Sequence, residues 1–198
     1  LDILWDYSDF FVLNISSPNT PGLRELQEEE HLSKVLLACN NVRERKGNYK
    51  PILLKFSPDM ENEQLLNSAE TSLKSGVDGF VATNTTVSRY VPKNSQSRSV
   101  FAQTGGLSGR PLKSRSLEVV NLLYDYTESK IPIVGVGGID SPESAWDMIN
   151  SGASLIQLYS ALVFQGPSVV SHIVKGLKRK VKENNFLNIQ EAVGYYHK

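Results

Sequence analysis

The sequence predicts an α/β fold in which parallel strands alternate with helices. Two observations carry this prediction: five short apolar runs, and a helical spacing of apolar residues between them. The runs are nearly continuously apolar, as strands covered on both faces are, and the order strand, helix, strand is typical of βαβ units. The predicted strands are 10–15 (FFVLNI), 51–56 (PILLKF), 79–83 (GFVAT), 131–136 (IPIVGV) and 154–158 (SLIQL).

Helices are expected in the stretches that separate and follow the strands. Leu32 and Leu36 show helical spacing in the first stretch, and Leu65 and Ala69 show it in the second. The fourth stretch follows DSPE, which combines cap residues with an early proline and is a typical helix start. The predicted helices are 23–45, 61–73, 114–128, 144–151 and 168–183, and a short closing helix is expected within 187–198.

Two architectures fit this order of elements, a doubly wound open sheet and a (β/α)8 TIM barrel. Polar residues such as Asn14, Lys55 and Asn84 stand where the predicted strands end. In a barrel these ends converge on one mouth, so we favour the barrel. A barrel needs eight strands, and five alone would leave open edges, so we expect the first three strand–helix units to be absent. Residues 1–198 are then the C-terminal part of one barrel domain, with strands 4–8 present.

Composition excludes several classes of function. Lys+Arg and Asp+Glu both number 21, so the net charge is zero and no basic footprint for nucleic acid exists. Cys39 is the only cysteine and is expected to pack inside a helix. The histidines (His31, His172 and His197) lie away from the strand ends, so neither a histidine base nor a metal site is expected. No apolar run approaches the length of a membrane span.

The ends of the last two predicted strands indicate a phosphate site. Gly137 and Gly138 would let backbone N–H groups approach a ligand, and Tyr159 and Ser160 stand at the next strand end. Barrels often bind phosphate between the loops after strands seven and eight. The alternative is a pair of ordinary glycine turns. The GGLSGR stretch over 105–110 either adds backbone donors to this site or only turns the chain; it ends a polar connection, 84–111, long enough to be functional or disordered.

Three further side chains are candidates for ligand contacts. Lys55 lies inside an apolar strand, which is costly without an anion or polar ligand. The alternative is a stem that lies along the barrel wall with the amine in water. Asn84 and Thr85 supply neutral donors and acceptors that suit an amide-rich planar substrate, or they cap a turn. Asp59 is expected to cap a helix.

The stretch NISSPNT, residues 14–20, is denser in hydrogen-bonding side chains than a turn requires. It holds no carboxylate, histidine or cysteine, so a serine or threonine would have to move any proton. Such a hydroxyl is a poor base unless a water-poor pocket relays its proton while a strong acceptor takes a hydride. A bound flavin is such an acceptor. Ser16 is expected to be structural.

Six segments in series resemble the dihydroorotate dehydrogenase family: NISSPNTPGL, LLKFSPD, DGFVATNTTVSR, TGGLSGRPL, IPIVGVGGI and GASLIQLYSALVFQGP. The resemblance runs from about residue 10 to the end of the chain. It implies an FMN-dependent (β/α)8 barrel that oxidises dihydroorotate to orotate in pyrimidine synthesis. The family's catalytic loop follows the fourth strand, which agrees with three missing units.

The resemblance also implies roles for single residues. Ser17 stands where the soluble class has cysteine, which implies the membrane-associated, quinone-reducing class and makes Ser17 the base that takes the C5 proton while hydride moves from C6 to the flavin N5. Lys55 matches a lysine near the flavin ring that also assists catalysis, and Thr83 matches another flavin contact. The positions matching substrate contacts are Asn14, Asn19, Asn84 and Thr85, and Asn14 is also assigned to the cofactor. The positions matching the ribityl phosphate region are Ser108, Gly109, Gly137, Gly138, Tyr159 and Ser160.

What the chain lacks bears on its expected activity. The family's N-terminal part should supply further flavin and substrate contacts and a helical pair that admits quinone from the membrane, which is the mitochondrial inner membrane in a eukaryote or the cytoplasmic face of the inner membrane in a bacterium. We therefore expect this chain alone to be inactive. Two alternatives remain open: another FMN barrel oxidoreductase of pyrimidine substrates, and a non-catalytic half-barrel that binds phosphate.

Overall fold

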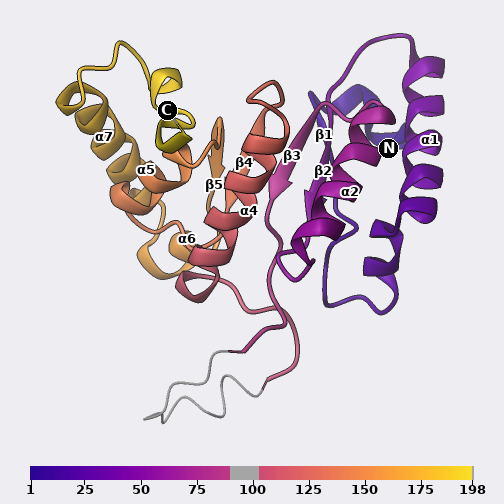
Figure 1. Cartoon of the computed structure of the whole chain (residues 1–198), viewed down its shortest axis with the longest axis horizontal. Coiled ribbons are helices and arrows are strands. Elements are labelled where there is room, and N and C mark those ends of the chain that lie inside the picture. Colours follow the sequence, from indigo (N-terminus) through magenta and orange to yellow (C-terminus); the bar gives the residue numbers. More distant parts are fainter. Residues whose placement is uncertain (90–102, 198) are drawn as a thin grey trace.

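The computed structural model describes residues 1–89 and 103–197 and confirms the α/β fold. Each predicted strand is present, and each is followed by at least one helix (Figure 1). The strands are β1 (Phe11–Leu13), β2 (Ile52–Phe56), β3 (Gly79–Ala82), β4 (Ile133–Val136) and β5 (Leu155–Gln157). The helices are α1 (Glu29–Lys46), α2 (Asn62–Lys74), α4 (Lys113–Tyr126), α5 (Pro142–Asn150), α6 (Ser160–Gln165) and α7 (Ser168–Glu183).

The five strands form one sheet in the order β1-β2-β3-β4-β5, and every neighbouring pair is parallel. The register aligns Leu54 with Phe80 and Val81 with Val134. Because all strands run the same way, their carboxyl ends meet at one edge, which faces downward in Figure 1. β1 and β5 each have one sheet neighbour, so they form the two ends of the sheet.

One apolar core joins the strands to their helices. Leu54, Phe56 and Phe80 are fully buried, and the rings of Phe56 and Phe80 lie 5.1 Å apart. The same core contains apolar side chains from α1, α2, α4, α5 and α7, so these helices share one face of the sheet. In the end strands the side chains of the opposite face are open, such as Val12 at 40% and Leu155 at 63% exposure, whereas Leu53 and Val81 on that face of the central strands are buried. The sheet is therefore covered by helices on one face, and its other face is open mainly at the end strands β1 and β5.

The predicted helix over 23–45 is wrong in one respect, because it is two elements. A 3₁₀ helix, η2 (Leu23–Gln27), comes first, and α1 starts after an extended residue, Glu28. Gln27 is buried, and its side-chain oxygen accepts a hydrogen bond from the Ser57 N–H at 3.2 Å. This contact with the loop after β2 requires the chain to leave the helical path.

Other parts of the prediction need smaller corrections. The expected closing helix consists of two 3₁₀ turns, η4 (Ile189–Ala192) and η5 (Tyr195–His197), and another 3₁₀ turn, η1 (Asp2–Tyr7), opens the chain. The long connection over 84–111 lies partly outside the described residues, but its two described parts meet in an antiparallel bridge between Thr86 and Leu107. None of the helices within the described ranges is long and apolar enough to cross a lipid bilayer.

Candidate active site

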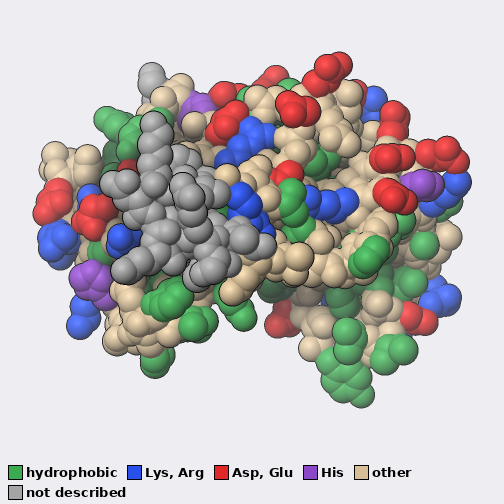
Figure 2. Space-filling model, turned by 90° about the horizontal axis from the view of Figure 1, so that it is seen from below, with side chains coloured by type: hydrophobic (Ala, Val, Ile, Leu, Met, Phe, Trp, Pro, Cys, Tyr) green, Lys and Arg blue, Asp and Glu red, His purple; other side chains and the backbone are tan. Residues whose placement is uncertain are grey.

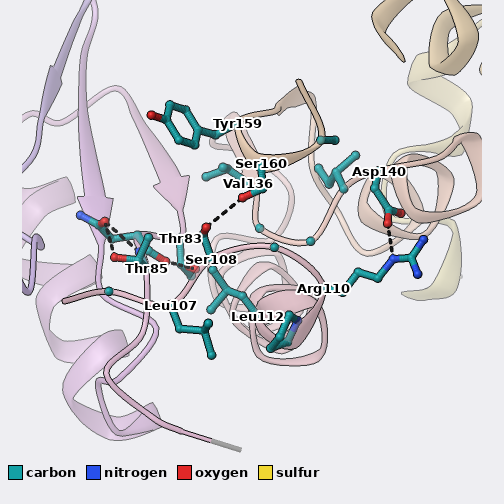
Figure 3. Close-up of a pocket in the computed structure, with 18 of the residues that line it drawn as sticks. Thr83, Thr85, Leu107, Ser108, Arg110, Leu112, Val136, Asp140, Tyr159 and Ser160 are labelled. Atoms are coloured by element: carbon teal, nitrogen blue, oxygen red, sulfur yellow. Dashed lines mark hydrogen bonds and ion pairs between the residues drawn. The ribbon is translucent and has the colours of Figure 1, made fainter. Parts of the chain in front are cut away.

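A cleft of about 700 Å³ lies at the carboxyl ends of four neighbouring strands (Figure 3). Its walls include Lys55 from β2, Thr83 just after β3, Val136 from β4 and Gln157 from β5. The parallel register places these residues at one edge, although up to 102 positions separate them in the sequence (157 − 55). Ser108 from the 105–110 stretch and Ser160 from α6 complete the cleft on the other side.

Glycines form the part of the wall after β4 because no side chain fits there. Gly137 and Gly138 have positive φ angles of 128° and 70°. A Cβ on Gly137 would come within 2.1 Å of the Ser116 Oγ, and one on Gly138 would come within 2.8 Å of the Lys113 Cα. The connection from β4 to α5 thus packs directly on α4, and its backbone lines the cleft.

Two predicted site segments meet across the cleft. The hydroxyl groups of Ser108 and Ser160 lie 2.8 Å apart (Figure 3). A Cβ on Gly109, whose φ is 79°, would lie 3.7 Å from the Ser160 Cβ, so the 105–110 stretch contacts the start of α6. α6 itself was not predicted, because SALVFQ is short and continues directly from the strand end. Tyr159 lies at the rim and is 75% exposed.

Lys55 brings a positive charge to the cleft at the end of β2. Its side chain is half-buried, and desolvation lowers the pKa of its amine below the ordinary value. No carboxylate among residues 1–89 and 103–197 lies within ion-pair distance of this amine. An anionic ligand in the cleft would offset this cost.

Three side chains of the predicted substrate region form one hydrogen-bond network. The Asn84 amide donates to the Asn14 Oδ1 at 2.9 Å and to the Ser16 Oγ at 3.0 Å, and the Ser16 hydroxyl donates to Asn14 at 3.3 Å. Ser16 is fully buried, as expected of a structural residue. The network joins the loop after β1 to the end of β3.

Asn19 and Thr85 meet at the 105–110 stretch. The Gly106 N–H donates to the Asn19 Oδ1 at 3.0 Å, and a Cβ on Gly106 would overlap the Thr85 Oγ1 at 1.8 Å. The Thr85 N–H donates to the Asn84 Oδ1 at 2.8 Å. Three loops therefore come together. Of the four predicted substrate residues, Asn84 and Thr85 line the cleft, whereas Asn14 and Asn19 do not.

Ser17 and Thr83 have hydrogen-bond partners within the chain. The half-buried Ser17 hydroxyl oxygen accepts from the Asn19 N–H at 3.3 Å, and Ser17 does not line the cleft. The Thr83 hydroxyl donates to the Asn84 carbonyl at 3.0 Å and lies 3.1 Å from the Ser116 Oγ. Thr83 is therefore held rigidly at the cleft wall.

The expectation that Asp59 caps a helix is wrong. α2 begins at Asn62 with Glu61 at its N-cap. The Asp59 carboxylate instead accepts hydrogen bonds from the Thr86 hydroxyl and the Val87 N–H, and it pairs with Arg24 at 3.0 Å. Sequence reasoning missed Arg24 altogether, because the helical pattern over 23–45 hid it among surface residues.

Comparison with known proteins gives a consistent result. The family model for dihydroorotate dehydrogenase matches residues 2–181. A protein of Trichodesmium erythraeum described as dihydroorotate dehydrogenase (quinone) is 43% identical over 202 residues, which covers 99% of this chain and 52% of that protein. A protein of Nautilia profundicola with the same description is 45% identical over 191 residues, covering 96% and 50%. The chain spans about half the length of the curated relatives it matches.

Solved structures agree with these relatives. A crystal structure described as DHODH from Eimeria tenella in complex with ferulenol superposes with a TM-score of 0.90 at 32% identity, covering 97% of this chain and 55% of that one. The ligand-free form gives a TM-score of 0.91 at 31% identity. These neighbours are TIM barrels, so the predicted barrel fold is confirmed for the strands and helices present here.

Proposed function

Since this chain belongs to the dihydroorotate dehydrogenase family, we propose that it forms strands 4–8 of a barrel that oxidises dihydroorotate to orotate. FMN would supply the acceptor for the hydride, and a quinone would be the final electron acceptor, in the synthesis of pyrimidines. A segment outside this chain supplies strands 1–3 and the contact with the membrane. The observation that carries the proposal is the glycine-lined cleft with the half-buried Lys55 amine, beside the Asn14, Ser16 and Asn84 network.

The residues present fit FMN at this cleft. The wall at Gly137 and Gly138 has no room for a side chain, so backbone groups are what it offers to a phosphate. Ser108 and Ser160 add hydroxyl donors beside it. Lys55, which lines the same cleft from β2, has a desolvated amine that a ring with developing negative charge would stabilise.

Each group of residues then has a separate task. The phosphate end of the cofactor would be held by the backbone at Gly137 and Gly138 with Ser108, Gly109, Tyr159 and Ser160. Thr83 and Asn14 would hold the ring system. Asn14, Asn19, Asn84 and Thr85 bind the carboxylate and ring amides of dihydroorotate. When bound, the flavin supplies the acceptor for the hydride.

Ser17 removes the proton from C5 of the substrate. A serine hydroxyl is a weak base, so its own proton must pass onward as it takes the substrate's. Among the described residues the Asn19 N–H donates to Oγ, a contact that does not use the hydroxyl hydrogen, so this hydrogen can pass onward in such a relay. The neighbouring Pro18 restricts the loop that carries Ser17.

Two alternatives make different predictions. Another FMN oxidoreductase of pyrimidine substrates would bind flavin but would not be reduced by dihydroorotate. A half-barrel without activity would bind phosphate but neither flavin nor orotate. The relatives described as quinone-dependent dihydroorotate dehydrogenases favour the main proposal over both.

The test joins this chain to the part of the Trichodesmium relative that it does not match, about half of that protein, which the proposal takes to be its N-terminal half. The assembled protein should be yellow, with a flavin band near ~450 nm that bleaches when dihydroorotate is added without oxygen. The chain alone should be colourless. Retained colour without bleaching would point to another flavin oxidoreductase, and an assembled, folded but colourless protein would contradict the proposal.

A further inference from the structure

We propose that Arg24, together with Asp59, is a positioning residue of this site, which fixes the loop that carries Ser17 against the loop that carries Asn84 and Thr85. The proposal rests on the proposed function, because it assigns a task to residues beside that site. Neither Arg24 nor Asp59 lines the cleft. Their effect on the reaction therefore passes through the residues that they hold.

Arg24 joins three loops that follow three neighbouring strands. Its Nε donates to the Ser16 carbonyl at 3.3 Å, in the loop after β1. Its Nη2 donates to the Thr85 carbonyl at 3.3 Å, after β3, and lies 3.0 Å from the Asp59 carboxylate, after β2. The side chains of Arg24 and Asp59 are only 27% and 16% exposed, so solvent screens the pair weakly.

Asp59 closes the arrangement from the other side. Its two carboxylate oxygens accept from the Thr86 hydroxyl and, at 2.9 Å, from the Val87 N–H. The carboxylate thus binds both Arg24 and the segment that follows Thr85. Thr86 in turn pairs with Leu107, which extends the connection to the 105–110 stretch.

The base of the Arg24 side chain is also fixed. Gln27 lies in the same 3₁₀ helix, η2, and its Nε2 donates to the Arg24 carbonyl at 3.4 Å. The Gln27 side-chain oxygen accepts a hydrogen bond from the Ser57 N–H. The backbone carbonyl of Gln27 accepts one from the buried Ser68 hydroxyl at 3.2 Å. η2 is therefore anchored to the loop after β2 and to α2, and this anchoring explains the break in the predicted helix.

Arginine suits this task better than lysine. A guanidinium presents several N–H groups in one rigid plane, so it can bind two carbonyls and a carboxylate at once in a fixed geometry. An ammonium would keep the charge but would not span the three acceptors. The Ser16 carbonyl lies immediately before Ser17 in the chain. The Thr85 carbonyl belongs to one of the two neighbouring residues, Asn84 and Thr85, that are proposed to bind substrate.

The consequence for the reaction is geometric. A base must stand within hydrogen-bond reach of the proton that it removes. Substrate bound by Asn84 and Thr85 comes within reach of Ser17 only if the two loops keep their relative placement. Because a displacement of about 1 Å costs about 100-fold in rate, loss of the Arg24 contacts should lower the rate of proton removal more than it weakens substrate binding.

The first experiment needs no activity and uses the assembled protein, because the chain alone is expected to self-associate. Hydrogen exchange of backbone amides is measured in wild type, Arg24→Gln and the control Arg179→Gln, whose side chain is 64% exposed on α7. In Arg24→Gln the amides of Thr85, Val87 and Gly106 should exchange about tenfold faster or more, as local opening allows. Amides of β2 and α4 should be unchanged. Unchanged exchange at the three loop amides, or a uniform increase over the whole chain, would overturn the proposal.

The second experiment measures flavin reduction by dihydroorotate in the assembled protein. In Arg24→Gln the limiting rate should fall about 100-fold with a much smaller change in KM for dihydroorotate and an unaltered flavin spectrum. Arg24→Lys should recover only part of the rate. Asp59→Asn loses the charge and replaces one of the two accepting oxygens with an NH2 donor, so it should show the same pattern and replaces Arg24→Gln if that variant does not fold.

The two experiments separate the two proposals. A wild-type rate in Arg24→Gln would overturn the positioning role while leaving the proposed function intact. If the assembled wild-type protein is not reduced by dihydroorotate, the proposed function fails. The exchange experiment then decides by itself whether Arg24 orders the three loops.

Discussion

Lys55 is the residue whose burial conflicts most clearly with its chemistry. The other four residues of β2 are apolar and buried, whereas the amine of Lys55 is half-buried at the cleft without a described carboxylate partner. Proteins often accept such a cost at a functional site, where stability and activity oppose each other. The sequence indicates this conflict, because a lysine inside ILLKF is unusual in a covered strand.

Replacing Lys55 should therefore stabilise the isolated chain. Burial lowers the pKa of the amine below its ordinary value of 10.5, so the unfolded chain binds more protons than the folded chain between the two values. The penalty is complete below the folded pKa and disappears as pH rises to 10.5. In urea unfolding, Lys55→Met should have a higher midpoint than wild type at neutral pH, and the difference should shrink at alkaline pH.

The control for this prediction is Lys175→Met, since Lys175 is an exposed residue of α7. That variant should track wild type at every pH. A Lys55→Met midpoint equal to or below that of wild type at neutral pH would show that the amine is already compensated within the chain. In the assembled protein the same substitution should lower flavin binding, because a charge that faces the ligand is lost.

The adjacent serines 16 and 17 should respond differently to substitution. Ser17→Ala in the assembled protein should slow flavin reduction by dihydroorotate about 100-fold to 10,000-fold, the usual range for a lost general base, with little change in orotate affinity. Ser16→Ala removes a buried hydroxyl that bonds to Asn14 and Asn84, so it should cost about 1 kcal/mol of stability. Anaerobic stopped-flow absorbance and urea unfolding measure the two effects. Equal rates in Ser17→Ala and wild type would remove Ser17 from the mechanism.

The connection from β4 to α5 is the element whose shape depends most on glycine. α5 begins with a capping box between Ser141 and Ser144, which fixes where the helix starts. The preceding residues must then pass over α4 with no side chain between them, and Gly137 and Gly138 satisfy this requirement. The same close approach leaves backbone groups at the cleft wall, so packing and ligand binding require the same residues.

Two glycines with the same backbone angle allow this packing to be measured. Gly138 and Gly47 both have φ of 70°, but an added Cβ meets Lys113 at Gly138 and nothing within 4 Å at Gly47. Gly47→Ala should cost about 1–2 kcal/mol, from the left-handed conformation alone. Gly138→Ala should cost about 1–3 kcal/mol more, from overpacking. If the two variants lose the same free energy of unfolding in urea, α4 and the connection from β4 to α5 can move apart at no cost in stability.

The whole molecule is an open sheet with a helix layer on one face. Its end strands, β1 and β5, have one paired edge each, and exposed apolar side chains include Phe164 at 86%. Figure 2, seen from the side where the strands end, shows hydrophobic side chains gathered along its lower edge. Open edges and exposed apolar surface are what a completed barrel removes.

The isolated chain should consequently self-associate, and the N-terminal half should suppress this. Light scattering at micromolar concentration is expected to show oligomers or aggregates of the chain alone and a monomeric barrel when the two halves are joined. Leu155→Lys, on the end strand β5, should reduce association of the chain. Leu187→Lys, at an 89% exposed position outside the sheet, should not. A chain that stays monomeric at all concentrations would contradict this prediction.

Local patterns in the sequence determined much of this protein. Continuous apolar runs and helical spacing located the five strands and most helices. A strand inside a fold is apolar at nearly every position, whereas a helix with one buried face is apolar at every third or fourth position. Cys39 is buried as expected, and the Glu28–Glu29–Glu30 run is exposed. The glycines and polar residues after the strands were recognised as site candidates because each stands at a strand end, where a parallel fold brings them together.

Only the tertiary structure decided how the loops at these strand ends are held together. Arg24 contacts Thr85 from 61 positions away, and Gln27 contacts Ser57 from 30 positions away. Such contacts leave no periodic trace, so Arg24 and Gln27 looked like helix residues and Asp59 looked like a cap. A hydrogen bond depends on where two segments meet after folding, whereas amphipathic spacing depends only on which side of one segment is buried.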